Sequence, residues 1–159
     1  MLTLYRKSGK RSVAIRAVLD TNIWVSAILN PAGFPAEIIK SFRQGAFLTV
    51  ISEPIISEIA DVLSRPRIKD KYGITEADIL ELLILIEERC EHVLLSGDIE
   101  VCRDPEDNSV IETAINGHAA YIVSRDDDIK FDKSVAAFLS QNNVIPISTA
   151  RFLQLIKEP

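Results

Sequence analysis

Val-Ala-Ile-Arg-Ala-Val-Leu-Asp-Thr-Asn, residues 13–22, contains the change from a buried strand to a helix. Its first seven residues, 13–19, are almost continuously apolar, which is typical of a strand covered on both faces of a parallel sheet. The strand ends at Asp20, and Thr21 or Asn22 can cap the helix that follows. A carboxylate directly after such a strand lies at the sheet edge where α/β proteins bind their ligands.

The rest of the chain alternates between strand and helix patterns. Further strands are expected at residues 47–51, 92–95, 120–124 and 143–147, and helices at 22–30, 35–44, 52–64, 75–91, 105–116, 132–141 and 149–157. Such alternation implies right-handed crossovers and a parallel sheet covered by helices on both faces. We therefore expect an α/β fold with three layers, α/β/α, as a single domain over residues 13–159 that follows a flexible basic tail, residues 1–12.

Length and composition limit the class of protein. With 159 residues, the chain is long enough for one domain with a substantial core. Apolar residues make up 47% and aromatic residues 6%, so the core should be mainly aliphatic. The sequence contains no apolar run of about 18 residues, so no membrane span is expected. Cys90 and Cys102 lack the spacing of a metal or redox motif. We expect a cytoplasmic protein with reduced cysteines and no membrane partner.

Charge is distributed unevenly along the chain. The net charge is −5, yet residues 1–16 carry five basic residues and no acidic one. A second basic cluster lies at residues 65–71. Both clusters could contact the phosphates of a nucleic acid, although a solubilising tail and a solvated loop explain them equally well. The candidate nucleic-acid-binding residues are Arg6, Lys7, Lys10, Arg11, Arg65 and Arg67.

Carboxylates recur where expected strands end or helices begin. They follow the first strand, lie within the helix at 52–64, open the helix at 105–116 and follow the strand at 120–124. Oxygen ligands gathered at one edge of a sheet suit a hard divalent cation such as Mg²⁺. The two histidines do not form a cluster with the cysteines, so a carboxylate site is the expected metal centre.

Asp20 and Glu58 are the candidates in the first half of the chain. Asp20 could instead cap its helix, but Thr21 and Asn22 can cap equally well. Glu58 lies about 40° from Val62 around its helix, at the margin of the buried stripe, so it is the acid of that helix aimed best at the core. The alternative for Glu58 is a side chain that extends outward to solvent.

Asp107 points along the buried face of its expected helix, which Val110, Ile111 and Ala114 define. A charge on such a face is costly unless something pairs with it, and a metal ion would. Alternatively, Asp107 favours the helix dipole from the third helical position, behind an Asp104 cap. For Asp104 itself, the capping role is at least as good as a role in the site.

The run Asp126-Asp127-Asp128 follows the strand at 120–124. Acidic runs are often solvated turns, but at least one member should face the same sheet edge as Asp20. Asp126 lies closest to the strand end and is preferred, with Asp128 as second choice.

These segments together resemble the PIN-domain family. The resemblance rests on Leu19-Asp20-Thr21-Asn22, Glu58, Cys102-Arg-Asp-Pro-x-Asp107 and Ser124-Arg-Asp-Asp-Asp128, and covers roughly residues 15–155. It implies a Rossmann-like fold with about five parallel strands and a Mg²⁺- or Mn²⁺-dependent nuclease that acts on RNA. In residue terms it implies the acidic quartet Asp20, Glu58, Asp107 and Asp126, with Thr21, Asn22 and Ser124 as supporting polar positions.

Phosphodiester hydrolysis by such a site needs no side-chain nucleophile, because metal ions activate water and stabilise charge. Asp20 and Asp107 are the expected principal ligands, and Glu58 and Asp126 would bind a second ion or orient water. A haloacid-dehalogenase-type phosphatase is disfavoured because Asn22 stands where its second aspartate belongs. A receiver domain and a nucleotide-binding module also lack their motifs.

Several roles remain open for the expected nuclease. It could be the toxin of a toxin–antitoxin pair, with an antitoxin protein as partner, or a processing nuclease. A homo-oligomer is compatible with either role. The non-enzymatic alternative is a PIN-like domain that binds RNA or protein without cleavage, which a metal-dependent cleavage assay would distinguish.

Overall fold

A computed structural model describes residues 4–7, 10–102, 104–124 and 133–157. The strands are β1 (Leu4–Lys7), β2 (Lys10–Val13), β3 (Arg16–Leu19), β4 (Leu48–Ile51), β5 (Glu91–His92), β6 (Tyr121–Ser124) and β7 (Ile145–Ser148). The helices are α1 (Thr21–Leu29), α2 (Phe34–Arg43), α3 (Glu53–Ser64), α4 (Pro66–Tyr72), α5 (Glu76–Arg89), α6 (Pro105–Asn116), α7 (Lys133–Gln141) and α8 (Thr149–Lys157).

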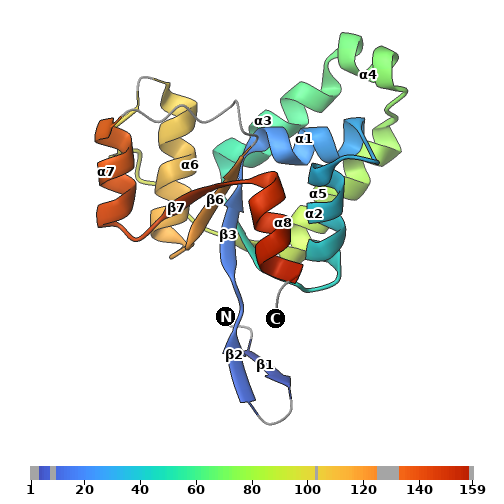
Figure 1. The fold of residues 1–159 in the computed structure, drawn as a ribbon. Helices are drawn as coiled ribbons and strands as arrows, with labels where there is room; N and C mark the ends of the chain where they lie inside the picture. Colours follow the sequence, from blue (N-terminus) through green and yellow to red (C-terminus); the bar gives the residue numbers. More distant parts are fainter. Residues whose placement is uncertain (1–3, 8–9, 103, 125–132, 158–159) are drawn as a thin grey trace.

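Five of these strands form one parallel sheet in the order β5-β4-β3-β6-β7. Figure 1 shows α6 and α7 on one side of the sheet and α1, α2 and α8 on the other. The three-layer α/β/α fold expected from the sequence is therefore confirmed. β3 lies in the centre of the sheet, so the residue that follows it, Asp20, is at the middle of the carboxyl edge.

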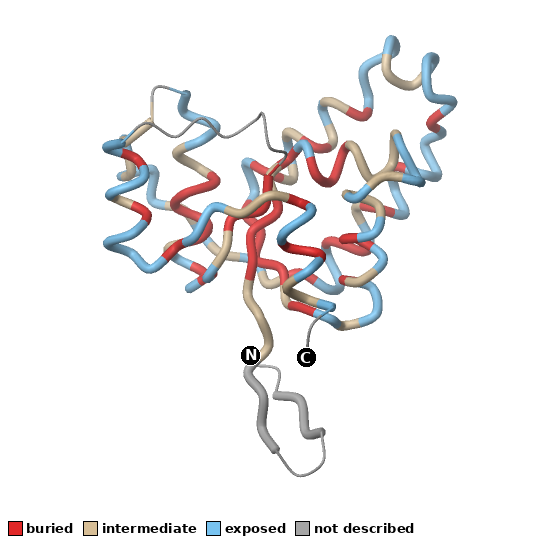
Figure 2. Tube along the Cα trace, viewed as in Figure 1, coloured by how far each residue is buried: buried red, intermediate tan, exposed pale blue. Residues whose placement is uncertain are grey.

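The core follows the central strands and the inward faces of the helices, as Figure 2 shows. Most of it is aliphatic, as expected, but a chain of aromatic rings fills the layer between the sheet and α1, α2 and α8. Trp24 packs edge-on against Phe42 at 6.0 Å, Phe42 contacts Phe47, and Phe47 packs against Phe152 at 4.9 Å. Trp24 is fully buried.

α6 approaches the sheet closely at its C-terminal end. A Cβ atom on Gly117 would overlap Val50 Cγ1 and lie 3.0 Å from Val50 Cβ. The Gly117 carbonyl also accepts a 3.0 Å hydrogen bond from Arg16 Nε, and the Arg16 guanidinium forms an ion pair with Glu91. These contacts join β3, β5 and the end of α6, and they fix α6 on its face of the sheet.

Two elements differ from the sequence expectation. Within the stretch expected as a tail, residues 1–12, β1 and β2 pair as an antiparallel ribbon, and this pairing takes Val13 out of the expected strand 13–19. The basic cluster at residues 65–71, expected as a loop, is the helix α4. α4 was not evident because it buries no residue and so shows no apolar stripe. The division into tail and domain remains a prediction.

Candidate active site

The pairing of β3 with β6 sets the centre of the candidate site. Leu19 lies opposite Val123, and the backbone N–H of Asp20 donates a 3.0 Å hydrogen bond to the Val123 carbonyl. The end of β6, with the buried Ser124, therefore lies beside Asp20. Asp126, Asp127 and Asp128 follow, but they fall outside the described residues, so their expected place at this edge remains a prediction.

Asp20 caps α1. Its Oδ1 accepts a 2.8 Å hydrogen bond from the backbone N–H of Thr21, and Asp20 occupies the N-cap position. The capping role considered for Asp20 is thus correct, and neither Thr21 nor the exposed Asn22 takes that position. A carboxylate has about four acceptor sites, so one capping bond is compatible with cation binding.

Thr21 connects the start of α1 to α3. The Thr21 side chain is 2% exposed, and its hydroxyl donates a 2.9 Å hydrogen bond to Glu58 Oε2. Glu58 is half-buried, which agrees with its predicted position at the margin of the core. α1 and α3 pack against each other, and α3 in turn contacts α6, so Glu58 lies between the two helix starts.

The pKa of Glu58 is raised, and the causes identify its neighbours. Desolvation is the largest cause, and the Thr21 hydrogen bond partly opposes it. Negative charge on Glu106 and Asp104, and a side-chain hydrogen bond with Glu106, raise the pKa further. The carboxyl group of Glu58 therefore faces the first turn of α6.

That first turn has the geometry of a capped helix. Asp104 Oδ1 accepts a 2.9 Å hydrogen bond from the backbone N–H of Glu106, so the capping role of Asp104 is confirmed. Asp107, at the third helical position, is exposed, whereas its helical phase predicted a buried face. The predicted helix is present as α6, and its buried residues begin at Val110, so the first turn with Asp107 lies beyond the part of the helix that packs against the core. Desolvation, followed by the charges of Asp104 and Glu106, still raises the pKa of Asp107.

Glu106 is the residue that sequence reasoning missed. It lines a cavity of about 360 Å³ together with Glu58, between α3 and α6. Helical phase favoured Asp107 over Glu106 because phase reports only the face toward the core. The contact of Glu106 with Glu58 depends on how α3 packs on α6, and nothing in one sequence indicates that packing. Asp61 also lines the cavity, but its carboxylate pairs with Arg65 at 2.9 Å.

The structure thus brings together Thr21, Glu58 and the first turn of α6, beside the capping Asp20. Within the described ranges, no three side chains of the His, Cys, Asp or Glu type are close enough to hold a metal ion. The chemistry of the donors nonetheless fits Mg²⁺ or Mn²⁺: all are oxygen ligands, and two carboxyl groups have raised pKa values, partly because their acidic neighbours repel their negative charge. A bound cation would relieve that repulsion.

A loop that precedes α6 is fixed to the helix at two points. Glu112, 3% exposed, accepts hydrogen bonds from the backbone N–H groups of Ser96 and Gly97, the second at 3.0 Å. One turn earlier, Asn108 Oδ1 accepts from the N–H groups of Val101 and Cys102, at 3.0 and 2.7 Å. The buried charge of Glu112 is therefore satisfied structurally, and these two clamps lead the chain to Asp104.

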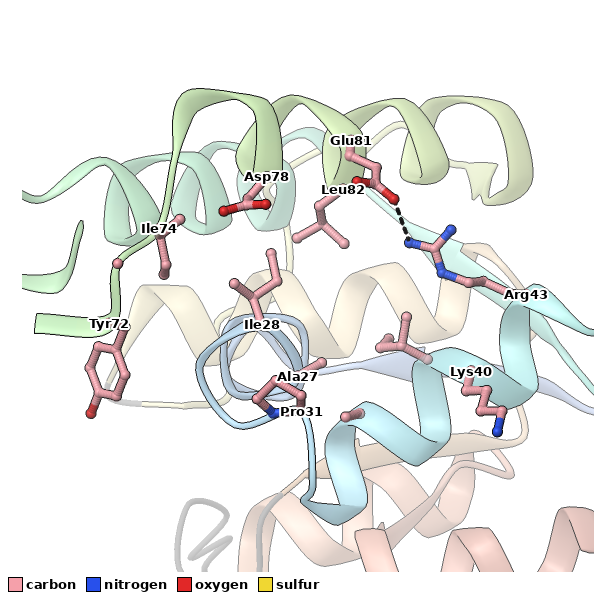
Figure 3. A pocket seen from close by; sticks show the side chains of 13 residues that line it. Ala27, Ile28, Pro31, Lys40, Arg43, Tyr72, Ile74, Asp78, Glu81 and Leu82 are labelled. Atoms are coloured by element: carbon pink, nitrogen blue, oxygen red, sulfur yellow. Dashed lines mark ion pairs between the residues drawn. The ribbon is translucent and has the colours of Figure 1, made fainter. Parts of the chain in front are cut away.

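A larger cavity, of about 570 Å³, lies between α1, α2 and the α4–α5 segment (Figure 3). Its wall is mainly apolar, with Ile28 and Leu82 among its residues, and the Arg43–Glu81 ion pair of 3.9 Å lies on its rim. None of the candidate site residues lines it.

In the described part of the chain, no helix is both long and apolar enough for a membrane span.

The model of the PIN domain matches residues 16–128. The chain is also 29% identical, over 132 residues, to the uncharacterized protein MJ1680 of Methanocaldococcus jannaschii, covering 83% of this chain and 84% of the relative. A solved structure with a similar fold is that of VapBC2 from Rickettsia felis bound to a promoter DNA fragment. Its TM-score is 0.54 at 16% identity, with 84% of this chain and 98% of that chain covered.

PIN domains are generally nucleases that typically use divalent metals. The family match covers β3 to β6, and with them Asp20, Glu58 and the acidic turn of α6. It also includes the motifs that carry the resemblance noted in the sequence, from Leu19 to Asp128. By this match, the chain belongs to the PIN-domain family.

Proposed function

We propose that this protein is a cytoplasmic endoribonuclease that hydrolyses phosphodiester bonds of single-stranded RNA with the help of Mg²⁺ or Mn²⁺. The observation that carries the proposal is the position of Glu58. Its carboxyl group is held by Thr21 and faces the acidic first turn of α6, beside the Asp20 cap of α1. Membership of the PIN-domain family supports a nuclease.

The acidic residues divide into groups with different roles in this proposal. Asp20 and Asp107 are the principal metal ligands, and Glu58 and Asp126 bind a second ion or orient the attacking water. Thr21 fixes Glu58 through its hydrogen bond. Asn22 and Ser124 line the same edge as polar supports, and Asp104 and Asp128 add negative charge.

A bound Mg²⁺ or Mn²⁺ would supply an activated water and stabilise charge at the phosphate. The chain contributes orientation, because helix starts at α1 and α6 fix their carboxylates on rigid elements. The Thr21 hydroxyl favours the charged form of Glu58 against the desolvation that raises its pKa. Glu58 can therefore hold a water molecule as a hydrogen-bond acceptor. No serine, cysteine or histidine nucleophile is required.

The test is cleavage of a labelled single-stranded RNA in Mn²⁺ by Asp20→Asn and Asp107→Asn, each checked for folding by circular dichroism. We expect both variants to lose activity and Asp61→Asn to keep it, since Asp61 pairs with Arg65. Unchanged cleavage in both site variants, from preparations free of other nucleases, would refute the assignment. Stable RNA binding without any metal-dependent cleavage by the wild type would instead favour a non-catalytic binding module.

A more specific role is the toxin of a toxin–antitoxin pair, with RNA as target, an antitoxin protein as partner and a homo-oligomer as assembly. The fold similarity to VapBC2 of Rickettsia felis supports this role. The test is to express the chain alone and together with the product of any small neighbouring reading frame. Growth arrest that the second protein relieves would support the toxin role, and normal growth with the chain alone would favour a processing nuclease.

A further inference from the structure

The helix α4 lies on the surface of the domain and buries none of its residues. Figure 1 shows α4 projecting beyond α3, on the side of the sheet where β3 ends and Asp20 begins the next turn of chain. Packing against the core therefore does not explain which side chains α4 carries, so its exposed residues can be considered as a binding surface.

The segment from residue 65 to residue 72 carries four positive charges and one negative charge, in a chain whose net charge is −5. Two of the four cations are paired within the protein. Arg65 forms an ion pair of 2.9 Å with Asp61 of α3, and Lys69 forms an ion pair with Glu76, the first residue of α5. These two pairs hold α4 between its neighbouring helices.

The other two cations, Arg67 and Lys71, are exposed. Within the part of the chain that the structure describes, neither forms an ion pair with a carboxylate, Asp70 of the same helix included. They are four residues apart and so lie on one face of α4, where like charges destabilise a helix. A helix of seven residues is also too short to be stable alone. A bound anion would neutralise this pair and stabilise α4.

Tyr72 adds an aromatic surface beside the two cations. Its side chain is 43% exposed, although it also lies at one end of the cavity of about 570 Å³ (Figure 3). The Lys71 ammonium lies over the ring, 5.3 Å from its centroid. Proteins bind single-stranded nucleic acid by combining cations for the phosphates with aromatic rings on which bases stack. An acidic protein or a lipid surface would use the charges alone, so the exposed ring favours a nucleic acid.

The helix α3 connects this surface to the candidate active site. Glu58 and Asp61 line the same cavity of about 360 Å³, and Asp61 pairs with Arg65. Arg65 follows Glu58 by seven residues, or about 10 Å along a helix, and the seven residues of α4 add at most about 10 Å. A nucleic-acid strand advances about 3.4 Å per nucleotide, so about six nucleotides reach from Glu58 to the end of α4.

We propose that Arg67, Lys71 and Tyr72 form a docking surface for single-stranded RNA, in which the two cations contact phosphates and Tyr72 stacks with a base. The cleavage of the docked strand rests on the proposed function, whereas its binding does not. Of the two residues selected in this segment from the sequence, Arg67 belongs to the docking surface, and Arg65 is held by Asp61.

The first experiment measures binding of a 12-nucleotide RNA in EDTA, where metal-dependent cleavage is absent. The test variant carries Arg67→Gln and Lys71→Gln. The control variant carries Lys40→Gln and Arg151→Gln, which remove two charges from exposed positions on α2 and α8. Circular dichroism checks the fold of each variant, and binding is measured over a series of salt concentrations.

Each phosphate contact with a single strand contributes about −0.7 to the slope of log K against log salt. We therefore expect the slope of the test variant to be smaller by about 1.4, with the slope of the control unchanged. Equal slopes for wild type and test variant, an equal loss in the control, or no binding by the wild type would overturn the proposal. A changed oligomeric state with unchanged RNA binding would also overturn it, because α4 would then be a protein contact.

The stacking role of Tyr72 is tested with two substitutions. Tyr72→Leu removes the ring and should weaken binding about tenfold, with an unchanged salt slope because no charge is lost. Tyr72→Phe keeps the ring and should bind like the wild type. Wild-type affinity of the leucine variant, or an equal loss in the phenylalanine variant, would show that the ring does not stack with a base.

The second experiment compares cleavage of a dinucleotide and of the 12-nucleotide RNA in Mn²⁺. The dinucleotide is too short to reach from Glu58 to Arg67. On the long RNA, we expect Arg67→Gln with Lys71→Gln to raise KM about tenfold at unchanged kcat, because docking is a binding interaction. Any loss on the dinucleotide should be smaller, and equal losses on both substrates would contradict a separate docking surface. If the wild type cleaves neither RNA, the proposed nuclease function fails, and the binding experiment still decides on α4.

Discussion

The hydroxyl of Thr21, at the start of α1, donates a 2.9 Å hydrogen bond to Glu58, within α3. The donor is buried and the acceptor is half-buried, so the bond is largely shielded from water. It joins a residue next to the central strand with a carboxylate that faces the first turn of α6. The orientation of Glu58 therefore depends on a neutral side chain.

Replacement of Thr21 with Val removes this donor and keeps the shape of the side chain. We expect a loss of about 1 kcal/mol in the free energy of unfolding. The pKa of Glu58 should rise further, because the lost bond favours its charged form. Urea denaturation and NMR titration of the Glu58 carboxyl measure the two effects. Thr21→Ser keeps the hydroxyl and should resemble the wild type, and an equally perturbed serine variant would show that methyl packing matters instead.

Asp104 has two separable effects, a capping bond and a negative charge. Asp104→Ala removes the cap of α6 and should cost about 1 kcal/mol of stability. Asp104→Asn keeps a capping side chain but removes the charge, so stability should be retained while the pKa values of Glu58 and Asp107 fall. Thermal melts with carboxyl titrations distinguish the variants. Identical behaviour of the two would mean that the charge of Asp104 does not act on its neighbours.

The raised pKa values of Glu58 and Asp107 predict how stability depends on pH without metal. For a carboxyl group whose pKa in the folded state is raised, the stabilising contribution is complete below its ordinary value, 4.5 for Glu58 and 3.8 for Asp107, and is lost as pH rises through the folded value. In EDTA, the double variant Glu58→Gln, Asp107→Asn should thus become more stable than wild type as pH increases from about 4 toward neutrality. Denaturation curves at several pH values test this. If the stability advantage of the double variant over the wild type instead increases toward lower pH, the prediction is wrong.

Metal binding should stabilise the wild type. A cation that binds only the folded state contributes about 2.7 kcal/mol at 100 times its dissociation constant. At roughly 2–4 °C per kcal/mol for a chain of this size, Mn²⁺ should raise the melting temperature by about 5–10 °C. Asp107→Asn should melt higher than wild type in EDTA and respond less to Mn²⁺, with Asp61→Asn as the matched control. A variant that melts lower in EDTA would identify Asp107 as a residue that only supports the helix dipole.

Gly117 tests the close approach of α6 to the sheet. Gly117→Ala adds a Cβ that overlaps Val50, and overpacking of this kind costs about 1–3 kcal/mol. Val50→Ala makes room, so the double variant should lose less than the sum of the two single losses. Chemical denaturation of all three variants gives the coupling. Strict additivity would mean that the helix end moves away from the sheet without cost.

The apolar pattern predicted the elements that bury a face. The expected helix at 52–64 corresponds to α3, and the expected helix at 75–91 corresponds to α5. A capping box of Thr75 and Asp78, with hydrogen bonds of 3.1 and 2.9 Å, begins α5. α4 was missed because it buries nothing, although Pro66 at its first position and Gly73 in the left-handed conformation are helix boundary signals.

The candidate site was less predictable than the fold. Asp20 and Glu58 could be selected because each lies on an element whose buried face the sequence defines. The exposure of Asp107 could not, because helical phase gives a direction but not the extent of the covering layer. The proximity of Glu106 to Glu58 depends on contact between two helices that are about 50 residues apart in the chain, and local patterns do not contain such contacts.

The two clamps on α6 have a practical consequence for protein engineering. Glu112 holds the chain at Ser96 and Gly97, and Asn108 holds it at Val101 and Cys102. Residues 98–100 lie between these two sets of hydrogen bonds. Residues inserted there would therefore be followed and preceded by segments that are both bonded to α6. Because loop closure costs little more as a loop grows, an affinity tag or a fluorescent reporter placed between Asp98 and Glu100 should leave the acidic turn undisturbed. The segment is thus a natural attachment point for following this nuclease candidate in solution.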